Sequence, residues 1–83
     1  MVLGMLKYEL IEGTDDLIRY KYYPEGMNEY GVVYIDKRTG NCGIETMAPE
    51  DCSGSSYILH MFSRMQSFLS ANSFRQSGKI AWM

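Results

Sequence analysis

Four short strand-like runs fill the first half of the chain and constrain its fold more than any other feature. They span Met5–Glu12, Asp16–Tyr23, Tyr30–Asp36 and Cys42–Met47. A period of two places successive side chains on opposite faces of a sheet. Segments rich in Gly, Pro, Asn and Asp separate the runs, which is typical of antiparallel hairpins. We therefore expect an antiparallel meander of four strands.

The turn after the third run has the clearest local chemistry. Asp36-Lys37-Arg38-Thr39-Gly40-Asn41 separates two apolar runs. The Asp36 carboxylate can accept hydrogen bonds from the turn amides, and Gly40 adopts positive φ at low steric cost. This segment predicts a hairpin between the third and fourth strands.

A different periodicity follows and predicts one amphipathic helix from about Ser56 to Ala71. Its polar side holds His60, Ser63, Arg64 and Ser67. Asn72 is suited to the left-handed position that ends a helix, and Phe74 can then return onto the last turn. The residues spaced three or four apart that form the apolar stripe are Ile58, Met61, Phe62, Met65, Phe68, Leu69 and Asn72.

The chain ends on a largely apolar segment, Lys79–Met83, for which we expect a fifth strand or a packed extension. The predicted fold is α+β, with element order β-β-β-β-α-β and the helix packed on one face of a four- to five-stranded sheet. Its 83 residues suit a single domain covering residues 1–83.

One helix covers one face of such a sheet, so the other face must contact solvent or a partner. Alternation predicts that the helix side holds Leu6, Tyr8, Leu10, Ile18, Tyr20, Val33, Ile35 and Ile44. The opposite side then holds Ile11, Leu17, Tyr23, Tyr30, Val32 and Tyr34, mixed with Lys7, Glu9, Arg19, Lys21 and Glu45.

Tyr and Arg are enriched in binding surfaces, because they bury apolar area and keep a polar tip. Three interpretations of the opposite side stay open: tyrosines that merely suit half-exposed strands, a self-association surface, and a surface for another macromolecule. The candidate interaction residues are Leu17, Arg19, Lys21, Tyr23, Tyr30, Val32 and Tyr34.

Charge and cysteine content narrow the partners and the compartment. The formal charge is −2 and the pI is about 5.2, which removes the global attraction to duplex DNA. No apolar run is long enough to cross a bilayer, so we expect no membrane partner. Cys42 and Cys52 are too few for a disulfide framework, and we expect reduced thiols in the cytoplasm.

The residues of catalytic or metal chemistry form no recognisable motif. Cys42, Cys52 and His60 are spaced by nine and seven residues, which matches no zinc module. Cys52 and His60 are the only candidates for a nucleophile and its base, with no third group to orient them. We expect no enzyme, no metal and no cofactor.

The order of four segments prompts a family comparison: Tyr22-Tyr23-Pro24-Glu25-Gly26, Asp36-Lys37-Arg38-Thr39-Gly40, Ala48-Pro49-Glu50-Asp51 and Gly78-Lys79-Ile80-Ala81-Trp82. In this order the chain resembles small uncharacterised proteins of Gram-positive gut-type bacteria and their mobile elements. The resemblance implies a bacterial cytoplasmic origin and transfers no activity or functional residue.

The sequence thus favours a non-enzymatic interaction module that forms a homodimer through the tyrosine-bearing face or through an edge strand. Another protein is a possible partner. The alternative is a small regulator that binds single-stranded nucleic acid or another protein through the same Tyr, Arg and Lys side chains.

Overall fold

The computed structural model describes residues 4–25, 29–47 and 56–82. Its elements follow the order β-β-β-β-α-β. They are β1 (Gly4–Gly13), β2 (Leu17–Pro24), β3 (Gly31–Asp36), β4 (Cys42–Thr46), α1 (Ser56–Ala71) and β5 (Ser77–Trp82).

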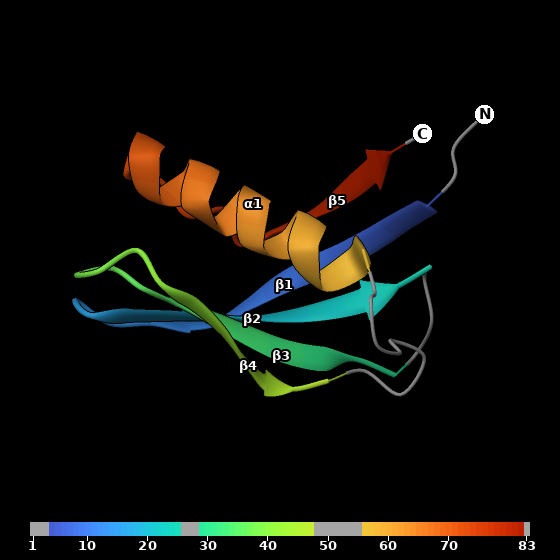
Figure 1. The fold of residues 1–83 in the computed structure, drawn as a ribbon, viewed down its shortest axis with the longest axis horizontal. Helices are drawn as coiled ribbons and strands as arrows, with labels where there is room; N and C mark the ends of the chain where they lie inside the picture. The colour runs from blue at the N-terminus through green and yellow to red at the C-terminus, as the bar shows by residue number, and fades with distance from the viewer. Residues whose placement is uncertain (1–3, 26–28, 48–55, 83) are drawn as a thin grey trace.

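All five strands form one open antiparallel sheet in the order β4-β3-β2-β1-β5 (Figure 1). The first four strands follow one another as a meander, and β5 returns to pair with β1 on its free side. The α+β class, the meander and the fifth strand predicted from the sequence are confirmed.

The helix lies across one face of the sheet and covers the core (Figure 1). Alternation along β1, β2 and β3 directs every second side chain toward it, as predicted. Within the described residues, no helix is long and apolar enough to span a membrane. The buried core consists of Leu6, Tyr8, Ile18, Tyr20, Tyr22, Val33, Ile35, Ile58, Met61, Met65, Phe68 and Ile80.

Three tyrosines are part of this core and are almost fully buried: Tyr8, Tyr20 and Tyr22. The rings of Tyr8 and Tyr20 meet edge to face with centroids 5.6 Å apart, and each also contacts the ring of Phe68. The Tyr20 hydroxyl donates to the carbonyl of Arg75 at 2.6 Å. Because a buried hydroxyl needs a partner, this bond ties the segment after α1 to the middle of the sheet.

The end of α1 forms as the sequence predicts. Asn72 has φ 54°, and the amides of Asn72 and Ser73 donate to the carbonyls of Leu69 and Phe68. The ring of Phe74 then packs against that of Phe68, with centroids 6.1 Å apart. These bonds satisfy carbonyls that the helix end would otherwise leave free.

The β3–β4 hairpin also follows the prediction. The Asp36 carboxylate accepts from the amide of Arg38 at 2.8 Å, and the Gly40 amide donates to the carbonyl of Asp36 at 2.7 Å. Gly40 has φ 80°, which is the left-handed conformation that glycine adopts without strain.

The pairing of β1 with β2 and that of β3 with β4 each contain one irregularity, between Leu10 and Glu12 and between Val32 and Val33, and one predicted core position is more exposed than expected. The register of β1 and β2 shifts between Leu10 and Glu12, so Ile11 is an extra residue and Glu12 lies opposite Arg19. Ile44 pairs with Val33 as expected for the helix side, yet 44% of it stays exposed. Because β4 is an edge strand, neighbours cover Ile44 less well than residues on the inner strands.

Because the phenol of Tyr20 is buried, we expect the stability of the fold to fall as the pH becomes alkaline. Burial, together with nearby Tyr8, raises the pKa of Tyr20 above its usual value. The folded state therefore holds this proton more tightly than the unfolded state, in which a tyrosine has a pKa of about 10. The stabilisation is full below about pH 10 and is lost as the pH rises above it.

We expect Tyr20→Phe to reduce stability at pH 8 by about 1 kcal/mol through loss of the Arg75 hydrogen bond, but to lose less additional stability between pH 9 and pH 12 than the natural protein. Urea unfolding followed by circular dichroism at several pH values measures both quantities. Equal losses of stability with pH in the two proteins would contradict this role of Tyr20.

Candidate interaction surface

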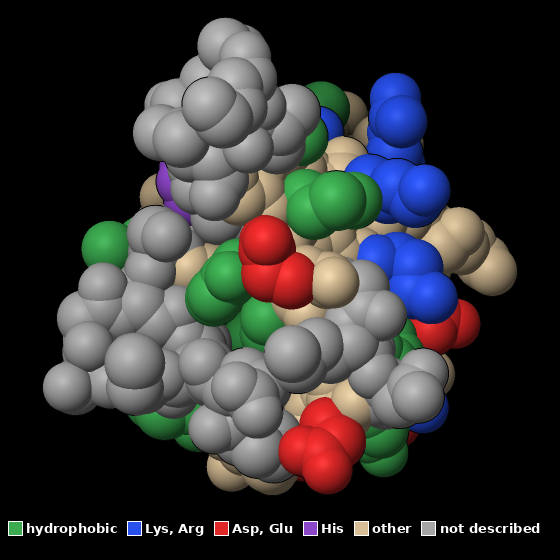
Figure 2. Space-filling model, turned by 90° about the vertical axis from the view of Figure 1, so that its right-hand side faces the viewer, with side chains coloured by type: hydrophobic (Ala, Val, Ile, Leu, Met, Phe, Trp, Pro, Cys, Tyr) green, Lys and Arg blue, Asp and Glu red, His purple; other side chains and the backbone are tan. Residues whose placement is uncertain are grey.

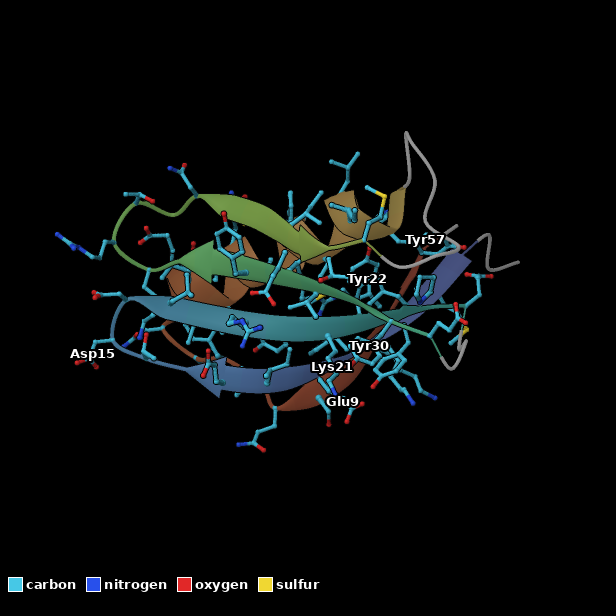
Figure 3. All side chains as sticks on the ribbon, turned by 90° about the horizontal axis from the view of Figure 1, so that it is seen from below. Glu9, Asp15, Lys21, Tyr22, Tyr30 and Tyr57 are labelled. Atoms are coloured by element: carbon cyan, nitrogen blue, oxygen red, sulfur yellow. The ribbon has the colours of Figure 1, made fainter. Side chains whose placement is uncertain are left out.

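The seven candidate residues all lie on the sheet face opposite α1, which we call the outer face. The register aligns Tyr34 with Arg19, Val32 with Lys21, and Lys7 with Tyr23 across neighbouring strands. Figure 3 looks onto this face, with α1 behind the sheet. Tyr30 precedes β3 and joins this face through its contacts with Tyr23 and Lys21. The outer face thus contains Leu17, Arg19, Lys21, Tyr23, Tyr30, Val32 and Tyr34.

An aromatic–lysine cluster occupies one end of the outer face. The rings of Tyr23 and Tyr30 lie with centroids 5.5 Å apart. Lys7 Nζ lies 4.9 Å from the centre of the Tyr23 ring, and Lys21 Nζ lies 4.6 Å from that of Tyr30. Tyr30 is nevertheless 41% exposed, and it lies close to Lys21 in Figure 3. These contacts hold the rings and ammonium groups in place while leaving Tyr30 accessible.

Glu9 adds a carboxylate to this cluster. Partial burial, with a hydrogen bond to Glu9 as the next cause, raises the pKa of Tyr23 above its usual value. The Tyr23 hydroxyl therefore remains a protonated donor throughout the neutral pH range.

An ion-pair network occupies the opposite end of the outer face. Arg19 Nε donates to Glu45 Oε1 at 3.0 Å, and a second guanidinium nitrogen contacts the other oxygen of the same carboxylate. Arg19 Nη1 also donates to Glu12 at 3.0 Å. The hydrogen bond with Glu45, and then that with Glu12, raises the pKa of Arg19. One guanidinium thus joins β1, β2 and β4.

The ring of Tyr34 lies over the backbone of Gly43 on the neighbouring strand. The two residues are cross-strand partners, and a Cβ added at Gly43 would overlap the Cζ and Oη atoms of Tyr34. A glycine in a strand often marks such a close approach, because an aromatic ring packs on the bare backbone.

Contacts within the sheet also cover the centre of the outer face. Val32 is only 7% exposed, although α1 lies on the other side of the sheet. Its cross-strand neighbours are Lys21 and Thr46. The outer face is therefore neither a bare apolar surface nor a set of freely solvated charges, but a surface whose side chains are largely held by one another.

Sequence reasoning missed several contributors to this face, among them Glu12, Gly43 and Lys79. Glu12 replaces Ile11 opposite Arg19 because of the irregularity in β1, for which the sequence has no clear signal. Lys79 is the cross-strand partner of Lys7. Lys79 is exposed and Ile80 is buried. Alternation could have predicted this difference once β5 was expected to join the sheet.

The structure describes two of the three candidates for catalytic or metal chemistry, Cys42 and His60. Cys42 is a half-buried free thiol whose Sγ approaches the carbonyl of Phe62 at 3.8 Å. Burial raises its pKa, so the thiol stays protonated near neutral pH. His60 is half-buried on α1, whereas Cys52 lies outside the described residues. Across residues 4–25, 29–47 and 56–82, no group of three His, Cys, Asp or Glu side chains is arranged to hold a metal ion.

Comparison of the chain with protein-family models, with curated proteins and with solved structures gave no match.

The contact between Tyr34 and Gly43 predicts that a side chain at position 43 destabilises the protein only while the Tyr34 ring is present. We expect Gly43→Ala to destabilise the protein by about 1 kcal/mol, because the new methyl group displaces the Tyr34 ring. In a Tyr34→Ala background the same substitution costs nothing, since the space is open. Chemical unfolding of the four proteins measures the coupling, and an equal cost of Gly43→Ala in both backgrounds would show that the ring does not pack there.

Proposed function

We propose that this protein is a non-enzymatic interaction module that forms a homodimer through its outer face. The observation that supports this best is the aromatic–lysine cluster of Lys7, Lys21, Tyr23 and Tyr30 on a sheet face that no helix covers among the described residues. Tyrosine side chains dominate many binding surfaces, because they contribute large contact area with few rotatable bonds.

The pre-existing contacts of this cluster favour binding. A side chain that is already held by its neighbours loses less conformational entropy when a partner arrives. The tilted packing of Tyr23 against Tyr30 and the lysines over both rings limit side-chain freedom in the monomer. A partner then contacts a surface whose shape is largely set in advance.

The thiol chemistry is consistent with a binding role in a reducing compartment. Cys42 is free, and burial raises its pKa, which disfavours the thiolate that a nucleophile requires. The proposal places the protein in the cytoplasm, as its low cysteine content predicts.

Single-stranded nucleic acid fits the outer face less well than a protein surface does. A base stacks on an open aromatic ring face. Lys7 and Lys21 lie over the rings of Tyr23 and Tyr30, and the two rings also pack on each other. These contacts reduce the ring area that is open to bases.

Analytical ultracentrifugation across a concentration series tests the proposal. We expect a reversible monomer–dimer equilibrium in the natural protein. Tyr30→Ala removes an exposed aromatic anchor and should raise the dimer Kd about tenfold or more. Leu59→Ala is the matched control, because Leu59 is 65% exposed on α1, away from the outer face.

Three results would contradict the proposal. The first is a 9.5 kDa monomer at all accessible concentrations. The second is a dimer that Leu59→Ala weakens and Tyr30→Ala does not, which would assign association to the helix side. The third is tight oligonucleotide binding that weakens as salt rises and requires Tyr30, which would favour the nucleic-acid alternative.

A further inference from the structure

The charges on the outer face are separated into two ends. We call Lys7, Lys21, Lys79 and Glu9 the basic end, and Arg19, Glu12, Glu45 and Asp36 the acidic end. Cross-strand register places the residues of each set close together, except for Glu45. The ion pair between Glu45 and Arg19 places Glu45 at the acidic end. Three lysines against one glutamate leave a formal charge of +2 at the basic end. One arginine against three carboxylates leaves −2 at the acidic end.

This separation runs along the strands. Lys7 and Glu12 lie on the same strand, roughly 16 Å apart at about 3.3 Å per residue. That distance exceeds the Debye length of about 8 Å at physiological salt, whereas Lys21 and Arg19, where the two sets adjoin on β2, are only about 7 Å apart. The fields of the two ends therefore differ mainly at the outer limits of the face. Figure 2 shows Lys and Arg side chains gathered along one side of the molecule where β1 begins and β5 ends.

Other charged residues near the two ends reduce the difference in net charge between them. Near the basic end, the Glu25 carboxylate accepts a hydrogen bond from the Met5 amide, and Glu29 precedes β3. Near the acidic end, Lys37 Nζ lies over the ring of Phe74, which packs against the helix-side core. Arg38 is in the β3–β4 turn, beyond the strands.

We propose that two copies of the chain pair outer face to outer face with their strands antiparallel, so that the basic end of each copy meets the acidic end of the other. This inference rests on the proposed homodimer and adds its orientation. A two-fold axis running across the strands produces this arrangement, whereas an axis along the strands sets like charges against each other.

The dimensions of the face suit such a dimer. Five strands about 4.8 Å apart and roughly seven residues long span about 24 by 23 Å. The flat area of the face is thus about 550 Å², below the roughly 800 Å² that a standard stable interface buries on each partner, which suits a weak and reversible dimer. Two twisted sheets stack with their strands within about 30° of alignment, so the outer faces can pack as the two layers of a sandwich.

Charge variants test the orientation by ultracentrifugation. Lys7→Glu with Lys79→Glu makes both ends acidic, and we expect the dimer Kd to rise about tenfold or more. Adding Glu12→Lys and Glu45→Lys inverts the whole face, and we expect the fourfold variant to dimerise again. Only the antiparallel pairing predicts that dimerisation returns. In that orientation, the ends that meet in the fourfold variant again have opposite charges.

The matched control is Arg64→Glu with Arg75→Glu, which changes net charge equally with one substitution on α1 and one just after it. We expect it to leave the dimer Kd within about twofold of the natural value. Circular dichroism and urea unfolding verify that each variant is folded. A salt titration of the natural protein gives a second measurement that needs no substitution, and dimerisation should weaken between 50 and about 500 mM NaCl.

The outcomes separate this inference from the proposed function. A monomeric natural protein overturns the homodimer itself. A dimer that neither the lysine substitutions nor salt weakens overturns the charge-paired orientation while leaving self-association intact. A fourfold variant that is folded yet as weakly associated as the lysine variant overturns the antiparallel arrangement.

Discussion

The structure depends on the fact that its single described helix covers only one of the two faces of the sheet. A single helix contributes Ile58, Met61, Met65 and Phe68 to the core on one face, and within the described residues no second layer covers the other face. The side chains of that outer face must therefore find partners within their own layer or in another molecule. The paired tyrosines, the lysines over their rings and the Arg19 network all follow from this constraint.

The elements were predictable because their signals are local and agree with one another. Alternation identified the strands, and three- and four-residue spacing identified α1 from Ser56 to Ala71. Turn and cap chemistry at Asp36 and Asn72 agreed with the same boundaries. The faces of β2 followed from its pattern, so the core positions of Tyr20 and Tyr22 were also predictable.

Contacts between strands were less predictable, because they depend on register. The irregularity in β1 exchanges Ile11 for Glu12 opposite Arg19 and so creates an ion pair that alternation alone does not contain. The packing of Tyr34 over Gly43 likewise requires that these two residues face each other across β3 and β4. The sequence indicated which side chains share the outer face, but not that they would hold one another so completely that Val32 is nearly buried.

The most direct measurement of association through the outer face is a dilution series of two-dimensional amide NMR spectra. If this face binds a second copy, the amide shifts that change with concentration should cluster at Arg19, Lys21, Val32 and Tyr34, while those of α1 stay fixed. Shifts confined to α1 or to the free edges of β4 and β5, or spectra that do not change with concentration, would contradict the assignment of the outer face as the binding surface.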